Sequence, residues 1–414
     1  MKKLRLILSF LGMIVLSLVG CGSGSNEADG KIVLSITVWN YEQAPEFQAL
    51  FQAYEDFNPD VTFDVIDISA DNYAEKLTTM LASEDTTDLL TMKNITDYSN
   101  FALRGQLVDM TEFVNSLDKE AYGDALEHLK TDEDQYFAIP YRTDFWALYY
   151  NKDLFDENGI DYPENLTWEE YRDIAKILTS GTGGDKVYGA HQHVWRSIVQ
   201  GVAAAQTGGD QLGGNYEFLK DYYETILAMQ AEGSIMDFGT ILSSNTSYRS
   251  QFELQKTAMM PMGSWYLAEL LDVDFNWGIA PLPQITKENE IITMGLPTSL
   301  AINKHSFQVE EAEKFIEYVT GEEGAKVLAS IGIVPAIRND EITNLYFNVA
   351  GMPDDDLSKR AFNPDVIESE VPLDKRTPTA DQILGEEHEL IMILDQSVDE
   401  GIKQMNERIA KELN

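Results

Sequence analysis

Several groups of residues match the first positions of metal-binding patterns. His388 and Glu389 begin the His-Glu-x-x-His pattern of zinc proteases, but Met392 stands where the second histidine ligand is needed. His191 and His193 are separated by one residue and offer two nitrogen ligands. Since no third ligand follows at a recognisable spacing, we expect both to be ordinary polar side chains. The sequence therefore predicts no metal site.

Other chemical patterns fail at the positions that their chemistry requires. Asp272 and Asp274 begin a calcium-loop pattern, but Trp277 occupies the sixth position, where glycine makes the sharp turn. The glycine-rich stretches at Gly181 and Gly208 lack the Gly-Lys-Ser/Thr of a phosphate-binding loop, and no Gly-x-Ser-x-Gly nucleophile motif occurs. Paired carboxylates for glycoside hydrolysis stay open, because 70 acidic residues supply many pairs. We expect no cofactor and no enzymatic activity.

The N-terminus has the order of a secretory signal. Three basic residues among the first five precede an uncharged, mostly apolar run at residues 6–19. This run is 14 residues long, whereas a membrane-spanning helix needs about 20. We therefore expect residues 1–20 to be removed as a signal peptide during export.

The only cysteine, Cys21, directly follows this run. It closes a Leu-Val-Gly-Cys sequence that resembles the lipobox of bacterial lipoproteins, in which the cysteine thiol is diacylated and becomes the first mature residue. A buried, inert thiol is the alternative, but the glycines and serines that follow predict a flexible tether over residues 21–30. We expect the lipid to hold the chain at the outer face of the cell membrane, and no disulfide to form within it.

Size and composition are those of a folded, acidic chain. The 414 residues are enough for two domains with their own cores, and 44% of them are hydrophobic. The formal net charge is −40 at pH 7, so nucleic acid is a poor partner. We interpret the acidity as a solvated, self-repelling surface and expect a monomer.

The first part of the chain alternates strand and helix patterns. Period-two or continuous apolar runs predict strands at residues 32–39, 61–66 and 88–92. Amphipathic patterns predict helices between them, at residues 44–57 and 73–83. This alternation indicates an α/β fold with a parallel sheet covered by helices.

The alternation breaks in the middle of the chain. Residues 136–140 and 145–150 predict two strands. A helix is expected at residues 167–178, because Thr167 and Glu170 have the spacing of a capping box. Further helices are expected at residues 215–232, 310–319 and 385–413, the last of these as one or two helices.

Seven segments, spread over most of the chain, together form a pattern that is specific for one protein family. They are Tyr136–Tyr141, Leu148–Phe155, Leu166–Tyr171, Ala258–Tyr266, Trp277–Pro283, Gly321–Ala325 and Gly332–Ala336. In this order they resemble the extracellular solute-binding proteins of carbohydrate ABC importers, the family that includes the maltose-binding protein.

The resemblance implies a two-lobed, type II periplasmic-binding-protein-like fold, with mixed sheets flanked by helices and a hinge between the lobes. The first lobe would comprise residues 31–141 and 297–338, and the second lobe residues 142–296 and 339–414. A carbohydrate would bind between the lobes and pass to the ABC permease subunits in the membrane.

The same resemblance implies a set of ligand-binding residues. Sugar recognition needs aromatic rings against the C–H faces of the sugar and polar groups in the plane of its hydroxyls. Trp265 matches a sugar-stacking tryptophan of the family, and Asp144 matches a carboxylate that lies seven residues before Asn151. The full set of candidates is Asn40, Tyr41, Glu42, Asn94, Asp144, Gln192, Trp195, Trp265 and Tyr266.

Two other functions stay open at this point. A secreted carbohydrate-active hydrolase would share the aromatic contacts with sugar, and product formation from oligosaccharides would identify it. A sugar-sensing subunit of a membrane signalling system would bind without transport, and neighbouring genes for a permease or a sensor kinase would distinguish the two.

Overall fold

The computed structural model describes residues 27–28, 30–287 and 290–413. The expected signal peptide, Cys21 with its expected lipid, and most of the expected tether lie outside the described residues. Within the described part of the chain, no helix has both the length and the apolar character that a membrane span requires.

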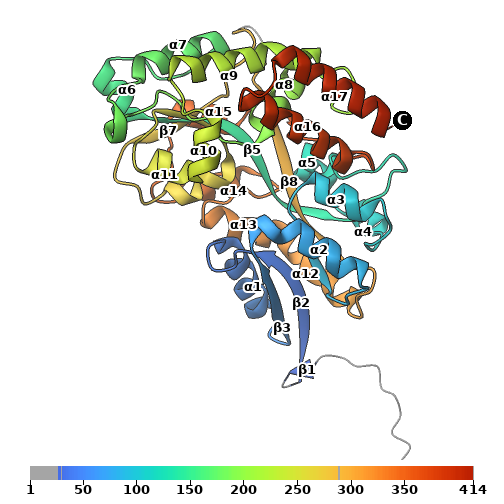
Figure 1. Cartoon of the computed structure of the whole chain (residues 1–414). Coiled ribbons are helices and arrows are strands. Elements are labelled where there is room, and N and C mark those ends of the chain that lie inside the picture. Colours follow the sequence, from blue (N-terminus) through green and yellow to red (C-terminus); the bar gives the residue numbers. More distant parts are fainter. Residues whose placement is uncertain (1–26, 29, 288–289, 414) are drawn as a thin grey trace, which may run out of the picture.

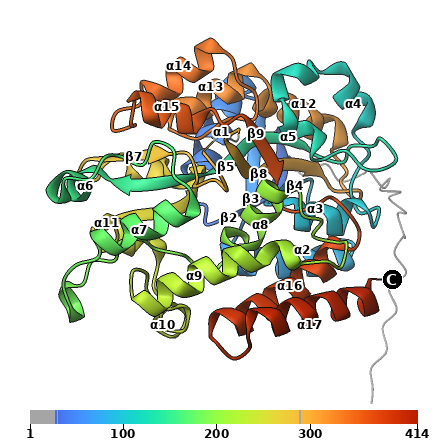
Figure 2. The same cartoon turned by 90° about the horizontal axis from the view of Figure 1, so that it is seen from above.

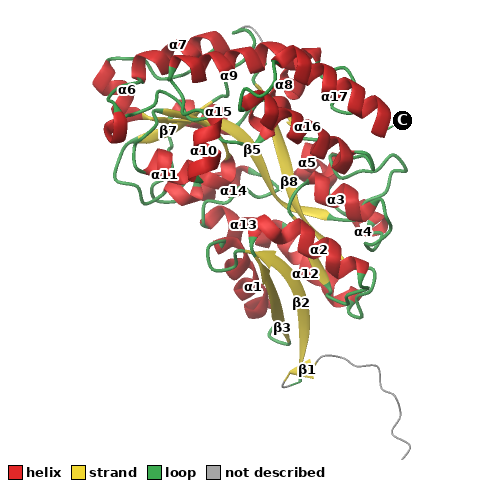
Figure 3. Ribbon diagram, in the orientation of Figure 1, coloured by secondary structure: helices red, strands yellow, loops and turns green. Residues whose placement is uncertain are grey.

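Strands from the whole length of the described chain form one sheet (Figure 3). The strand order is β1-β2-β4-β8-β5-β6, with β3 beside β2, β7 beside β5 and β9 beside β8. The strands are β1 (Glu27–Ala28), β2 (Lys31–Trp39), β3 (Val61–Ile68), β4 (Leu89–Met92), β5 (Ile139–Asn151), β6 (Met259–Gly263), β7 (Trp277–Ala280), β8 (Ile292–Ile302) and β9 (Val366–Ser369). Parallel pairs join β2 to β3 and β4, whereas β8 runs antiparallel to β4 and β5.

Strands β1–β4 lie with a first group of helices (Figure 1). These helices are α1 (Pro45–Phe57), α2 (Tyr73–Ala82), α3 (Ile95–Ala102), α4 (Thr111–Ser116), α5 (Asp124–Glu127), α12 (Val309–Thr320) and α13 (Glu322–Ser330). Among them, α1 packs against β3 and α3 against β4, while α5 packs against β5 and β8. The predicted strand and helix alternation is confirmed here. The core of this part of the fold is aromatic. The ring of Phe51 in α1 stacks on that of Phe63 in β3 with 4.5 Å between the centroids, and the ring of Phe315 in α12 lies 4.8 Å from that of Phe63.

The other α-helices of the described residues belong to the rest of the chain. They are α6 (Lys152–Asn158), α7 (Trp168–Leu178), α8 (Gln200–Thr207), α9 (Lys220–Glu232), α10 (Phe238–Ser244), α11 (Tyr248–Glu253), α14 (Asp340–Phe347), α15 (Asp356–Phe362), α16 (Thr377–Met392) and α17 (Val398–Glu412). Seen from above, helices lie on both sides of the strands (Figure 2). The expected start of the C-terminal helices at Gly385 is wrong, because α16 begins at Thr377, with a proline in its first turn, and Gly385 lies within it.

Two long strands, β5 and β8, lie side by side in the middle of the strand order. The first half of β5 pairs with β8, and its second half pairs with β6 and β7. The prediction of separate strands at 136–140 and 145–150 is wrong, because β5 runs without a break through the polar residues Arg142 and Asp144. Those two side chains are buried and charge-paired, so they do not interrupt the strand. A third segment lies beside β5, where the Ala336 N–H donates to the Tyr141 carbonyl.

Candidate solute-binding site

Three tryptophans from distant parts of the chain meet beside the end of β6. The ring centroid of Trp265 lies 5.5 Å from that of Trp146 and 6.0 Å from that of Trp195. Strand pairing explains the first contact, because Trp146 of β5 lies opposite Gly263, and Trp265 follows in the turn after β6. Trp146 is buried, Trp265 is half-buried, and Trp195 is 37% exposed. The cluster therefore offers partly open aromatic faces on a rigid base.

Uncharged aromatic side chains surround Trp195. The ring of His193 packs edge-on at 4.5 Å, and the ring of Tyr248 lies 5.6 Å away. Burial lowers the pKa of His193 to about 4 and raises the pKa of Tyr248 to about 12. Both groups are therefore neutral at pH 7, and the contacts of Trp195 are apolar and aromatic.

A buried carboxylate lies next to this cluster. Ser264, which precedes Trp265, donates a hydrogen bond of 2.9 Å to Asp144 Oδ1. Arg142 faces Asp144 with its Nε 3.7 Å from Oδ2, and its other side pairs with Glu46 of α1 at 3.3 Å. Burial raises the pKa of the Asp144 carboxyl, while Arg142 and Ser264 act in the opposite direction.

Two atoms of this charge pair lack hydrogen-bond partners. Asp144 Oδ2 and Arg142 Nε are both buried and unpaired within the described residues, since 3.7 Å is too long for a hydrogen bond. A hydroxyl group can accept from an N–H and donate to a carboxylate oxygen at the same time. The pair is therefore chemically suited to a neutral hydroxyl.

Polar residues of the first lobe lie at the carboxyl ends of its parallel strands. Asn40 adopts a left-handed backbone (φ 46°), and its Oδ1 accepts a hydrogen bond from the Ala70 N–H. Asn94 caps α3 by accepting from the Asp97 N–H at 2.8 Å. Lys93 donates to the Ala70 carbonyl and lies over the Trp39 ring. Both asparagine carbonyls therefore already hold the loops at this edge in place.

The remaining candidates lie elsewhere in the fold. Tyr41 and Glu42 line a groove of about 460 Å³ between α1 and β3. Gln192 is only 4% exposed, and its amide donates to the Tyr171 hydroxyl. Tyr266 is fully buried, with its hydroxyl 3.3 Å from a carboxylate oxygen of Glu253. Gln192 and Tyr266 thus belong to the core in this conformation, and only Trp195, Trp265 and Asp144 lie at the tryptophan cluster.

Several polar neighbours of the cluster were not expected from the sequence. Trp146 Nε1 donates to Glu370 after β9 at 3.4 Å. Arg196, next to Trp195, donates to Asp381 of α16 and to Gln211. Trp146 lies in the aromatic and apolar stretch at residues 145–150, and Glu370 is one of 70 acidic residues, so neither position carried a signal.

Comparison with known proteins identifies the family. Residues 40–326 match the family described as bacterial extracellular solute-binding protein. A multiple sugar-binding protein of Streptococcus mutans is 24% identical over 346 residues, which cover 77% of this chain and 78% of that protein. An arabinooligosaccharide-binding protein of Bacillus subtilis is 22% identical over 353 residues, 80% of this chain and 79% of that protein.

Solved structures agree with this assignment. A sugar transporter from Rhizobium etli, in an open conformation, superposes with a TM-score of 0.79 at 31% identity, over 92% of this chain and 99% of that chain. An ABC substrate-binding protein from Listeria monocytogenes, in complex with cycloalternan, shares the fold with a TM-score of 0.80 at 23% identity, covering 92% of this chain and 99% of that chain. The resemblance and the type II periplasmic-binding-protein fold expected from the sequence are confirmed. This chain belongs to the bacterial extracellular solute-binding proteins.

Proposed function

We propose that this protein is the sugar-binding subunit of an ABC importer. It captures a mono- or oligosaccharide and delivers it to permease subunits in the membrane. The observation that carries the proposal is the tryptophan cluster, Trp146, Trp195 and Trp265, beside the unpaired atoms of Asp144 and Arg142. The names of the relatives in Streptococcus mutans and Bacillus subtilis support a carbohydrate as the solute.

In this proposal the sugar lies against the exposed faces of Trp195 and Trp265. Pyranose and furanose rings present apolar C–H faces, which stack on aromatic rings. A hydroxyl at the edge of the same sugar would bridge Arg142 Nε and Asp144 Oδ2. A neutral polyol matches this mixture, because it supplies both apolar faces and groups that donate and accept hydrogen bonds.

The lobes in this proposal comprise residues 31–141 with 297–338, and residues 142–296 with 339–414. The strands β5 and β8 cross between them, and a hinge in these segments closes the lobes over the sugar. The receptor acts as a monomer without turnover. A lipid on Cys21 and the tether that follows keep it near its permease at high local concentration.

A thermal-shift screen of the purified protein against mono- and oligosaccharides tests the proposal. A ligand that binds only the folded state raises the unfolding temperature. We expect at least one sugar to do so, with saturable binding by calorimetry and no product after prolonged incubation. If hydrolysis products form, the protein is an enzyme; if no carbohydrate binds, another solute class must be sought.

A further inference from the structure

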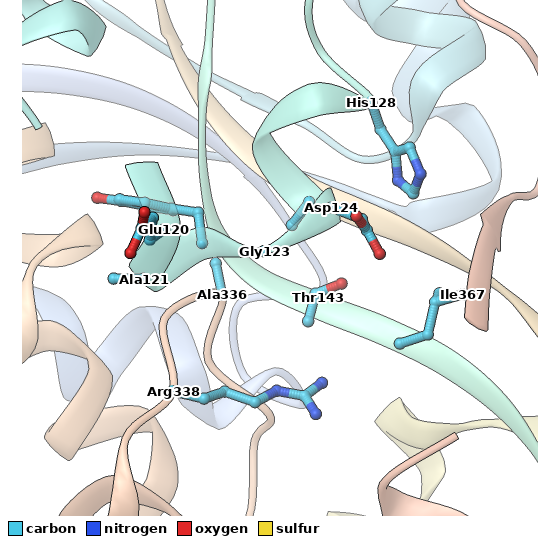
Figure 4. A pocket seen from close by; sticks show the side chains of 11 residues that line it. Glu120, Ala121, Gly123, Asp124, His128, Thr143, Ala336, Arg338 and Ile367 are labelled. Carbon is cyan, nitrogen blue, oxygen red and sulfur yellow. The ribbon is translucent and has the colours of Figure 1, made fainter. Parts of the chain in front are cut away.

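A pocket of about 280 Å³ lies where the lobes meet, apart from the tryptophan cluster (Figure 4). Asp124 and His128 line it from the first lobe, and Ile367 of β9 lines it from the other side. Arg338 and His128 lie on opposite sides of Thr143, which belongs to the crossing strand β5. The pocket is therefore built from both lobes and from the segments that join them.

Arg338 is the only arginine or lysine that lines this pocket. Its guanidinium carbon lies 5.0 Å from the Phe362 ring centroid and 5.9 Å from that of Phe145. Within the described residues its guanidinium makes no hydrogen bond and no ion pair, although the chain has 70 acidic residues. Burial lowers the pKa of Arg338 to about 10, so it still carries its charge at pH 7. The Asp144 carboxylate raises the pKa of Arg338, but no carboxylate of the described residues lies within ion-pair distance of its guanidinium. A half-buried cation without such a direct partner gains from a bound anion.

The other polar groups restrict the kind of anion. The Thr143 hydroxyl makes no hydrogen bond within the described part of the chain, so it is free to donate. Burial lowers the pKa of His128, which is therefore neutral at pH 7. The exposed carboxylates Glu120 and Asp124 lie along the lining and repel any anion, but their repulsion grows with the charge of the ligand and is weakest for a monoanion. The pocket thus favours a single negative charge on a small molecule.

We propose that this pocket binds a small monocarboxylate, such as a hydroxy acid, whose carboxylate pairs with Arg338 and accepts a hydrogen bond from Thr143. Planar guanidinium and carboxylate groups form two parallel hydrogen bonds. Because both lobes contribute walls, occupancy of the pocket changes the affinity for sugar, and sugar changes the affinity for the anion by the same factor. This coupling rests on the proposed function, whereas the anion site does not.

Calorimetric titration with L-lactate at constant ionic strength tests the site. We expect saturable binding with a dissociation constant on the order of 1 mM or tighter. Arg338→Gln should weaken it at least tenfold, and Thr143→Val, which keeps the side-chain volume, by several-fold. Arg360→Gln is the matched control, since Arg360 is a surface residue paired with Asp365. The affinity of this variant for lactate should equal that of the parent.

The outcomes separate the two proposals. Equal lactate affinity in the parent and in Arg338→Gln, or no saturable binding to the parent, would overturn the anion site. Inorganic phosphate binding more tightly than lactate would overturn the assignment to a monocarboxylate. Retained binding of the best sugar from the screen shows that Arg338→Gln is folded. Lactate binding without any sugar binding would leave the anion site standing and contradict the sugar receptor.

Discussion

At the scale of single residues, the proposed selectivity of the site rests on Asp144 and Arg142. One buried acceptor and one buried donor lie 3.7 Å apart without partners. A carboxylate would meet the repulsion of Asp144, and an ammonium group that of Arg142, whereas a hydroxyl satisfies both. This local chemistry favours a neutral solute even though the whole chain carries a net charge of −40.

Truncation of Trp265 tests the stacking surface. We expect Trp265→Ala to weaken sugar binding at least tenfold, which corresponds to about 1.4 kcal/mol. The unfolding temperature should change little, because the ring is only half-buried. Tyr162→Ala, an exposed aromatic on the loop after α6, is the control and should leave the affinity unchanged. An unaltered dissociation constant for Trp265→Ala would remove this residue from the site.

Asp97 provides a test by pH. Burial raises its pKa from 3.8 to about 6, with Asp381 adding to the rise and Lys93 opposing it. Since the folded state holds this proton more tightly than the unfolded state, the contribution of Asp97 to stability is full below pH 4 and is lost as the pH rises through 6. The free energy of unfolding of Asp97→Asn should therefore match that of the parent at pH 4 and exceed it at pH 7 by up to about 3 kcal/mol.

Urea unfolding at both pH values measures this difference. Asp365→Asn is the control with the opposite sign, because hydrogen bonding from the Ile291 main chain and from Arg360 lowers the pKa of Asp365. Its carboxylate contributes stability above its ordinary pKa, so the substitution should cost stability at pH 7. If the difference in free energy of unfolding between Asp97→Asn and the parent is the same at pH 7 as at pH 4, the charged Asp97 carboxylate does not destabilise the fold.

At the scale of elements, the turn after β6 positions the aromatic surface. A Cβ at Gly263 would lie 1.9 Å from the Trp265 ring, so the ring folds back over a position that only glycine leaves open. Ser264 in the same turn donates a hydrogen bond to Asp144, so the turn joins Trp265, the proposed stacking residue, to Asp144, the proposed hydroxyl-binding residue. Their relative geometry therefore depends on one short segment.

We expect Gly263→Ala to displace the Trp265 ring and to weaken sugar binding several-fold or more. Tryptophan fluorescence should shift, because the contact of Trp265 with Trp146 changes. Gly385→Ala is a matched control, since an added Cβ at that helical position meets no atom within 4 Å. It should leave affinity unchanged and add up to about 1 kcal/mol of stability. Parental affinity in Gly263→Ala would mean that the position of the ring does not determine binding.

At the scale of the whole molecule, the two lobes share one sheet through β5 and β8. Glu46 of α1 pairs with Arg142 on β5, so the first lobe contacts the same strand that carries Asp144. In addition, α16 of the second lobe packs against α3 of the first. Movement of the lobes would therefore act on the binding residues directly.

Small-angle X-ray scattering tests this movement. We expect saturating sugar to reduce the radius of gyration, because closure brings the lobes together. A sugar that binds without changing the scattering curve would contradict a hinge mechanism. At the same sugar concentration Trp265→Ala should bind less sugar, so its radius of gyration should decrease less than that of the parent.

The sequence alone was sufficient for features that depend on neighbouring residues. The alternation of strands and helices in the first lobe follows from local periodicity, and the helix α7 begins at the Thr167 and Glu170 capping box as expected. The family followed from ordered segments, and the expected lipid on Cys21 depends only on a contiguous N-terminal pattern. Such signals need no knowledge of which distant residues meet.

Only the tertiary structure decided which of the candidate residues lie together. Trp146, Trp195 and Trp265 are separated by about fifty to seventy residues at each step. The pairing of β5 with β6 brings Trp146 and Trp265 together, and Trp195 packs onto them from a separate loop. The same pairing placed Asp144 beside Ser264, while Gln192 and Tyr266 are buried by core packing. Contacts between distant segments arise from strand register and burial, which the local pattern of one sequence does not encode.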